Sequence, residues 1–558
     1  MSNVTNRWVL WKKFWWHYVS RYKKLIIACI VFALIQVSTG AFNPYFMRNT
    51  IDAITQKAWN TLKFWLIVWF ISGGINIIAL FFRYYSIQRI NINVYNDIAL
   101  DMYRKCHTTP YSKISQMSTG YIMQRFSDDL PKMTPLIMDM LTNVVGNSVF
   151  LILMFVIMFK ISVLLSSIAA AFFILSIVGY QVYKRIIPQV TNMRQQALAY
   201  YLKELEEGLN VTYTIRIHGA LNRALKRFGS ALGEYLRKFF AFEMLQAKYQ
   251  GIFTNGLLFA SQITIIGIGA VFALKGILTI GTLMAFMTYT RYLYFVTSFI
   301  TTFAVTVEPS LVSLKRVMEV LSWREEYVIE KIKKPQLNKK HPYIIEVKNL
   351  NFRFNDIIVF ENLNLAIKKN SITAILAKSG YGKTTLFNLW FKLYPVPDNT
   401  IFIDGRDINK IELDEIVGIF TCIEQEPKFV TDSVWENLKL ISPSIDTEKV
   451  KELLRIMRLE NFFDYISSKH TASKLNDLSG GERKRLAILR GLLRDTPVVI
   501  MDEPTAFLDR RTAKKILSNL VEFLKNNGKT VIIATHDPLA VSVCEDIIKL
   551  EEIARRAS

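Results

Sequence analysis

The feature that most constrains this chain is a series of long apolar segments in the part before Val305. A helix needs about 20 consecutive apolar residues to cross the hydrocarbon core of a membrane. Six segments meet this requirement, and polar or basic stretches separate most of them. They cover residues 25–45, 62–82, 137–159, 161–183, 252–274 and 278–303. The sequence therefore predicts a helical membrane region with six spans.

The composition changes after the last of these segments. Apolar residues make up 51% of the 558 residues, which is high for a soluble chain of this length. Beyond Lys331 the sequence has the composition of a soluble α/β domain, and the length allows more than one domain. We expect an interfacial N-terminal helix at 1–24, the membrane region at 25–324, a polar linker at 325–340 and a soluble domain at 341–558.

The basic residues indicate how the spans are oriented. They are concentrated before the first span, between spans two and three, and between spans four and five. Basic loops face the cytosol, so both termini are expected there, in a chain of the cytoplasmic membrane. The net charge of +23 could indicate nucleic-acid binding or the basic loops of a membrane protein. The second interpretation is favoured because the charge lies beside the apolar segments, so we expect contact with membrane lipid and no nucleic acid.

Two internal stretches, 83–135 and 184–250, are too long to be turns. Both contain few Pro or Gly residues and keep helical spacing of apolar residues, so the spans are expected to continue into the cytosol as long helices. Short turns are expected near 110–117 and 209–219. Two independent loop domains are the alternative, but neither stretch has enough apolar residues for its own core. Spans three and four are separated only by Lys160, which predicts a tight hairpin.

A phosphate-binding pattern follows the linker. The β-branched run at 372–376 leads into Ala-Lys-Ser-Gly-Tyr-Gly-Lys-Thr-Thr at 377–385 and then a helical pattern at 386–393. A strand, a glycine-containing loop and a helix let backbone N–H groups and the helix N-terminus surround phosphate oxygens. Ala377 replaces the usual first glycine, which is tolerable where its φ is negative. We expect ATP phosphates to be bound by Ser379, Gly380, Gly382, Lys383, Thr384 and Thr385, with the Thr384 hydroxyl on Mg²⁺.

Five further motifs follow in a fixed order. They are Gln425 within Ile-Glu-Gln-Glu-Pro, Leu-Ser-Gly-Gly-Glu at 478–482, the apolar strand ending in Asp502 and Glu503, Ala-Phe-Leu-Asp ending at Asp509, and Thr-His-Asp around His536. This series resembles the ATP-binding-cassette family, in which the corresponding motifs are the Q-loop, signature, Walker B strand, D-loop and switch histidine. The resemblance implies an α/β P-loop NTPase domain that hydrolyses ATP with Mg²⁺.

The resemblance also implies a role for each matching residue. Glu503 would be the general base or would position the attacking water, with a surface salt bridge as the alternative. His536 would contact the γ-phosphate, with a purely structural role as the alternative. Gln425 would contact Mg²⁺ or the water, and Asp502 would hold Mg²⁺. The signature would bind ATP held by another subunit through Leu478, Ser479, Gly480, Gly481 and Glu482, beside Asp509 of the D-loop.

The adenine platform is expected from position alone. Members of this family carry an aromatic residue about 20–25 residues before the phosphate loop, and a phenylalanine ring can stack on a base. Phe354 matches that position. The alternative is that Phe352 or Phe354 is simply a strand residue of the core.

The membrane half resembles the exporter-type branch of the same family. The matching segments are 118–120 with 123–129, 280–286, and 313–321, so the resemblance covers nearly the whole chain. Two departures lie in the soluble half: 471–477 lacks the usual Gly-Glu-rich pattern, and Asp502-Glu-Pro504 is closer to importer motors.

These features predict ATP-driven export of an amphipathic substrate, such as a peptide or a hydrophobic small molecule, by alternating access in a homodimer. A lipid flippase, an importer with exporter architecture and a subunit of a heterodimer are the alternatives. Polar residues inside spans are costly and often mark a pathway, although they also join helices to one another. The candidates for the substrate cavity are Arg291, Tyr292, Asn255 and Gln262.

Overall fold

The computed structural model describes residues 2–133, 145–326, 332–333, 335–354, 357–378, 380–430, 433–441, 445–463 and 478–553. The chain forms two compact units. The first comprises Met1–His107 and Ser118–Trp323, and the second comprises Thr108–Met117 and Arg324–Ser558. The short segment 108–117 therefore belongs with the soluble unit, although it lies between two membrane helices in the sequence.

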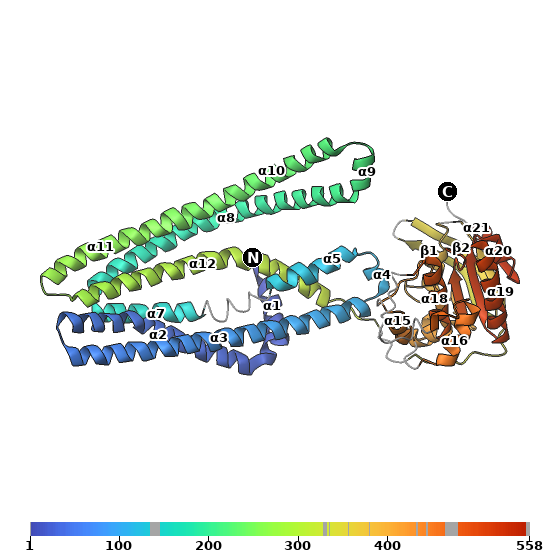
Figure 1. The fold of residues 1–558 in the computed structure, drawn as a ribbon, viewed down its shortest axis with the longest axis horizontal. Coiled ribbons are helices and arrows are strands. Elements are labelled where there is room, and N and C mark those ends of the chain that lie inside the picture. Colours follow the sequence, from blue (N-terminus) through green and yellow to red (C-terminus); the bar gives the residue numbers. More distant parts are fainter. Residues whose placement is uncertain are drawn as a thin grey trace. The chain divides into compact units, whose positions relative to one another are not determined.

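The first unit is helical (Figure 1). Its helix α3 has 50 residues and is far longer than a membrane is thick, because a helix rises 1.5 Å per residue. The apolar segments thus continue into long polar extensions, as predicted. The elements are α1 (Ser2–His17), η1 (Val19–Tyr22), α2 (Lys23–Thr55), α3 (Trp59–Thr108), α5 (Thr119–Gln124), η2 (Arg125–Asp129), α7 (Val145–Ile161), α8 (Val163–Asn210), α9 (Thr212–Ile217), α10 (Leu221–Gln246), η4 (Ala247–Thr254), α11 (Asn255–Leu274) and α12 (Ile280–Leu321).

Four helical stretches among the described residues are long and apolar enough to cross a membrane: Val19–Thr55, Trp59–Thr108, Val163–Asn210 and Leu221–Leu274. The shorter apolar helix α7 contains only part of the expected third span, since residues 137–144 lie outside the described ranges. Helix α12 includes the sixth apolar segment except its first two residues. A membrane region is therefore present, and the number of six spans stays a prediction.

The hairpin between α7 and α8 differs in detail from the prediction. Helix α7 continues through Lys160 to Ile161, and Ser162 is the one residue between the two helices. The Ser162 hydroxyl accepts a hydrogen bond from the backbone N–H of Leu165 at 3.4 Å and so caps α8. Lysine is readily accommodated in a helix, whereas serine favours the cap, which places the break two residues later than expected.

Helices α8 and α10 lie side by side (Figure 1), joined by the short helix α9. The rings of Tyr183 and Tyr249 stack with centroids 4.3 Å apart, and those of Tyr201 and Tyr235 stack at 5.6 Å. Near the tip, Arg227 bonds Glu204 and Glu207 on α8. The stretch 184–250 is thus a long helical pair and has no separate globular core.

The second unit contains two sheets in its described residues. Strands β6 (Phe420–Ile423), β7 (Val498–Asp502), β8 (Thr530–Thr535), β3 (Ile372–Leu376) and β9 (Asp546–Lys549) form a parallel sheet in that order. Strands β2 (Ile357–Lys368), β1 (Tyr343–Phe354), β4 (Ile401–Ile403) and β5 (Arg406–Asp407) form an antiparallel sheet in that order. The central parallel strands are apolar on both faces, as strands covered on both sides must be.

The helices of this unit are α4 (Tyr111–Ile114), α13 (Lys383–Trp390), η5 (Ile408–Lys410), α14 (Leu413–Ile419), α15 (Val434–Ile441), α16 (Thr447–Ile456), α18 (Gly480–Leu492), α19 (Arg510–Asn526), α20 (Pro538–Val541) and α21 (Leu550–Ile553). In a parallel sheet all carboxyl ends lie at one edge, and ligands bind there in open α/β folds. The loops after β3, β6, β7 and β8 therefore meet at the same edge.

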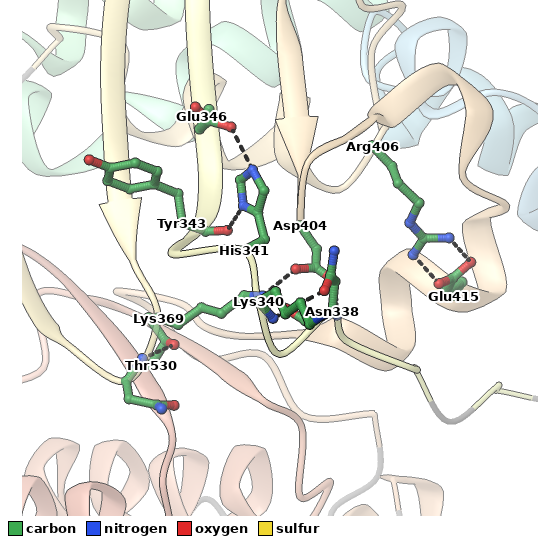
Figure 2. Close-up of polar contacts among 11 residues, drawn as sticks. Asn338, Lys340, His341, Tyr343, Glu346, Lys369, Asp404, Arg406, Glu415 and Thr530 are labelled. Carbon is green, nitrogen blue, oxygen red and sulfur yellow. Dashed lines mark hydrogen bonds and ion pairs between the residues drawn. The ribbon is translucent and has the colours of Figure 1, made fainter.

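The segment just before β1 is held against the β4–β5 turn by hydrogen bonding to Asp404 (Figure 2). The buried Asp404 carboxylate accepts a hydrogen bond from the Asn338 N–H and pairs with the Lys369 ammonium. His341 lies between the Tyr343 carbonyl, 2.8 Å from its Nδ1, and the Glu346 carboxylate, 3.5 Å from its Nε2. These contacts fix the entry to the soluble unit.

We expect Asp404→Ala to destabilise this unit by about 3–5 kcal/mol, because it leaves the poorly exposed Lys369 ammonium without its carboxylate. Thermal unfolding of the purified protein measures the effect. Glu415→Gln is the matched control, because it disrupts a more exposed pair with Arg406 and should cost about 1 kcal/mol or less. Equal melting temperatures for the two variants would contradict this account.

Candidate active site

The loop between β3 and α13 has the backbone that phosphate binding requires. Gly380 and Gly382 have φ angles of 83° and 84°, a region that favours glycine. A Cβ at Gly382 would also lie 2.8 Å from the Phe360 ring. Ala377 is buried and does not have a positive φ, so its methyl group meets the condition set by the sequence. Ser379 lies outside the described residues.

Lys383 begins α13 directly after this loop, and Thr384 and Thr385 follow it in the first turn. The Lys383 ammonium lies 3.2 Å from Glu503 Oε1, and only 14% and 6% of the two side chains are exposed. The structure therefore joins the loop after β3 to the residue after β7 through a buried ion pair. Thr384 is exposed at the start of the helix.

Glu503 is held from three sides. His536 Nδ1 lies 2.7 Å from its Oε1, and the Thr535 hydroxyl donates to its Oε2 at 3.0 Å. Its backbone has a φ of 43°, which is costly for a residue with a side chain, and its N–H donates to the Ala534 carbonyl at 2.9 Å. Glu503 is therefore not a surface glutamate. Its position is determined by the ends of β7 and β8.

These contacts set the protonation state of Glu503. Burial acts to raise its pKa, but hydrogen bonds from His536, Thr535 and Lys383 outweigh that effect and hold the pKa below its ordinary value. The carboxylate is therefore ionised at neutral pH, as a base must be. The His536 side chain is 80% exposed and remains accessible to a ligand at the same edge.

The end of β7 also fits a magnesium ion. Burial raises the pKa of Asp502, and its Oδ1 is buried without a hydrogen-bond partner among the described residues. Buried polar atoms almost always have a partner, and carboxylate and hydroxyl oxygens are the ligands that Mg²⁺ prefers. Gln425 follows β6, which pairs with β7 in parallel, so its side chain starts from the same edge. Asp502, Gln425 and Thr384 are therefore the residues that would hold Mg²⁺, and this role stays a prediction.

The signature segment forms a well-capped helix start. Ser479 is the N-cap of α18, and its hydroxyl accepts a hydrogen bond from the Glu482 N–H at 3.3 Å. The Glu482 carboxylate accepts the Ser479 N–H at 2.8 Å, and the hydrogen bonds from Ser479 lower the pKa of Glu482. Leu478 is buried, whereas Ser479 and Gly480 are exposed. The start of α18 is therefore exposed, and its use as a second anion site stays a prediction.

The D-loop packs directly on this helix start. A Cβ at Gly481 would lie 3.0 Å from the Phe507 carbonyl oxygen, so the close approach requires a small residue. Asp509 caps α19 by accepting a hydrogen bond from the Thr512 N–H at 2.9 Å. Within one chain, Asp509 is thus a helix cap, and any contact with a second subunit stays a prediction.

Lys484 is a buried residue that the sequence analysis did not identify. Its side chain is fully buried, and its ammonium donates to the carbonyl oxygens of Glu424, Gln425 and Asp502. Burial lowers the pKa of Lys484 to about 8. Helical spacing could have predicted its burial, because Ala487 and Ile488, three and four residues later, belong to the buried face of α18.

Phe354 ends β1 and is partly buried. Its ring meets Tyr394 edge-on, with centroids 5.4 Å apart and an interplanar angle of 87°. Tyr394 also contacts α4, where the Tyr111 ring lies 6.0 Å away and the Ser115 hydroxyl 3.5 Å away. Tyr394 therefore lies between the expected adenine platform and the segment that follows α3. Stacking on adenine stays a prediction.

The candidate cavity residues lie on α11 and α12. Arg291 and Asn255 are exposed in the single chain, and Gln262 is partly buried. Tyr292 packs edge-on against Phe150 of α7, with centroids 5.6 Å apart. Their role in substrate binding stays a prediction.

Other polar groups in the spans join helices. The Asn76 amide of α3 donates to the Gln36 carbonyl and the Thr39 hydroxyl of α2, at 3.0 and 2.7 Å. This is the helix–helix bonding that the sequence left as an alternative to a pathway.

A glycine-containing loop between a buried strand and a helix, with its lysine paired to a buried glutamate at the carboxyl edge of a parallel sheet, defines a P-loop ATPase, and this one is joined to a helical membrane region. Two family models match the chain: one described as ABC transporter transmembrane region over residues 26–297 and one described as ABC transporter over residues 360–506. The chain belongs to the ABC transporters, with the membrane region and the ATPase domain in one polypeptide.

Several relatives are similar over most of their length. A putative export ATP-binding/permease protein of Rickettsia felis is 24% identical over 549 residues, covering 96% of this chain and 93% of the relative. An ATP-dependent lipid A-core flippase of Syntrophus aciditrophicus is 25% identical, covering 87% and 80%. A putative multidrug export ATP-binding/permease protein of Staphylococcus aureus is 25% identical, covering 96% and 94%.

We expect Thr535→Val to lower the kcat of ATP hydrolysis roughly tenfold with little change in KM, because it removes one hydrogen bond to the charged Glu503 side chain. Thr530→Val is the matched control. Thr530 is equally buried on β8, but its hydroxyl accepts the Asn370 N–H far along the strand from Glu503. A similar loss of kcat in both variants would mean that the strand, and not the Glu503 contact, is responsible.

Proposed function

We propose that this chain is a half-transporter that works as a homodimer and uses ATP hydrolysis to export an amphipathic compound across the cytoplasmic membrane. The observation that carries the proposal is the separation of the two anion sites within one chain. The signature helix α18 contacts the ends of β6 and β7, whereas the phosphate loop follows β3, two strands beyond β7 in the sheet.

The separation implies a second chain. Neighbouring strands lie about 4.8 Å apart, so roughly 10 Å of sheet separates β7 from β3. Ser479 and Gly480, at the exposed start of α18, thus lie at a distance from the chain's own phosphate loop. Facing copies related by a two-fold axis would place each signature opposite the other copy's loop, which is the closed symmetry most homo-oligomers adopt. Two equivalent and complete ATP sites result.

The residues at the carboxyl edge of the parallel sheet then have separate roles in ATP hydrolysis. Lys383 and the backbone N–H groups after β3 bind the β- and γ-phosphates, which compete with Glu503 for the Lys383 ammonium. Glu503 remains held by Thr535 and orients the attacking water, and the exposed His536 reaches the γ-phosphate. Thr384, Asp502 and Gln425 would hold Mg²⁺, which neutralises charge on the phosphate oxygens.

The contacts of Tyr394 support coupling between ATP and the membrane region. Tyr394 touches Phe354 on one side and Tyr111 and Ser115 on the other, all within the second unit. Helix α4 follows directly after α3, which has 50 residues and includes an expected span. Movement of the nucleotide edge is thus passed to the end of a membrane helix.

The relatives support export and leave the substrate open. Those named export or multidrug export proteins favour an amphipathic compound, and the relative named lipid A-core flippase favours a lipid. Both classes combine an apolar body with a polar group, which suits a pathway of apolar helices with a few polar residues such as Arg291 and Gln262. Lipid flipping is therefore the second candidate function.

ATPase activity of the purified protein in lipid vesicles tests the proposal, with panels of peptides, lipids and amphipathic drugs added separately. We expect basal hydrolysis that one panel stimulates. Glu503→Gln should reduce hydrolysis by at least about a hundredfold, because general-base catalysis contributes that much. Asn519→Asp, on an exposed face of α19, is a control that should retain full activity. An inactive wild-type chain would contradict the homodimer and favour a heterodimer.

A further inference from the structure

We propose that Lys484 is a positioning residue that connects the signature helix to the catalytic edge of its own chain. Through it, contact between the signature and a nucleotide on the partner would adjust the geometry of Glu503. This inference rests on the proposed two-chain ATP site.

The Lys484 ammonium makes three hydrogen bonds, which engage all of its N–H donors. Its Nζ lies 2.8 Å from the Glu424 carbonyl oxygen, 3.1 Å from that of Gln425 and 3.0 Å from that of Asp502. An ammonium group has three N–H donors, and each is directed to one carbonyl. These are charge-assisted hydrogen bonds, which are stronger than neutral ones. The side chain is 0% exposed, so water does not compete for them.

The three carbonyls belong to the two segments that carry the chemistry. Glu424 and Gln425 directly follow β6, and Asp502 ends β7. The Asp502 carbonyl is part of the peptide group that leads into Glu503. Holding this peptide plane restricts rotation about the Glu503 N–Cα bond, whose φ of 43° is unfavourable for glutamate. Lys484 therefore supports the strained backbone that directs the Glu503 side chain.

The other end of the connection is the signature. Lys484 lies five residues after Ser479, in the second turn of the 13-residue helix α18. A hydrogen-bonded helix moves as a rigid body, so a shift of its N-terminus on nucleotide contact also moves the Lys484 side chain. The same shift reaches the peptide groups of Gln425 and Asp502. The Lys484 side chain thus links the signature, which would contact the partner's nucleotide, with the catalytic edge around Glu503 in its own chain.

Burial of this lysine is not explained by packing. Placing an ammonium in the interior is costly, and an apolar side chain of similar size would often be more stable there. The nearby carboxylates of Glu424, Asp502 and Glu503 and the Cys422 thiol of β6 are the titratable groups that face it. The Lys484 ammonium is buried despite this cost, and its partners are carbonyl groups next to the catalytic residues. Its placement therefore fits a role in the reaction.

The test compares Lys484→Met and Lys484→Gln in lipid-reconstituted protein. Methionine keeps the volume without donors, and glutamine restores two N–H donors without the charge. We expect Lys484→Met to lower kcat about tenfold or more with little change in KM, and Lys484→Gln to recover part of the loss. Arg490→Met is the control: Arg490 is on the same helix and donates to the Lys428 carbonyl at 2.8 Å, and not to the carbonyls that Lys484 holds. It should keep the wild-type kcat.

A double-mutant cycle with Ser479→Ala tests the connection itself. If Lys484 passes on the signature contact, the fold-loss from Ser479→Ala should be smaller in the Lys484→Met background than in the wild type. The proposal would be contradicted if the fold-loss of kcat in the double variant equalled the product of the two single fold-losses. It would also be contradicted if Lys484→Met kept the wild-type kcat, or if Lys484→Met and Lys484→Gln lost the same amount of kcat. Melting temperatures identify a variant that has merely unfolded. If the wild type hydrolyses ATP and Glu503→Gln does not, a negative result here leaves the proposed function intact.

Discussion

The structure of the active edge depends on one buried ion pair, between Lys383 after β3 and Glu503 after β7. Strand β8 lies between these two strands, and its last residue, Thr535, and the following His536 contact the same carboxylate. Three neighbouring loops therefore meet at a single side chain. Because the pair is nearly inaccessible to water, its attraction is screened little, and Glu503 keeps an unfavourable backbone conformation that solvent alone would not support.

The parallel sheet imposes a second constraint. Its carboxyl edge brings together the loop after β3, Asp502 and Glu503, and the strand order places the signature helix beside β6 and β7, away from the loop after β3. One chain thus keeps the loop after β3 apart from the exposed N-terminus of α18. The membrane region joins this arrangement through segment 108–117, which packs with the soluble unit and has Tyr394 as a contact.

Much of this arrangement follows from the sequence, for identifiable reasons. The run at 372–376 is entirely β-branched or apolar and corresponds to β3, and Gly382 was placed by the spacing of the phosphate loop. The fold class was predicted because span length and strand–loop–helix order are local signals. Lys484 was missed because lysine on a helix normally faces water, and only the tertiary fold supplies the three carbonyls that hold it. The helix break was placed two residues too early because its position is set by one capping residue, Ser162.

The central claim is that each ATP site is formed by two copies of this chain, and complementation tests it directly. Lys383→Ala removes the phosphate-binding lysine. Gly480→Asp places a carboxylate at the signature, where a Cβ meets nothing closer than 3.6 Å and an acidic residue suits the helix start. Each variant alone should be inactive, and vesicles containing both should recover ATP hydrolysis, because mixed dimers have one intact loop facing one intact signature. A mixture that remains inactive, although mixed dimers form, would contradict the account.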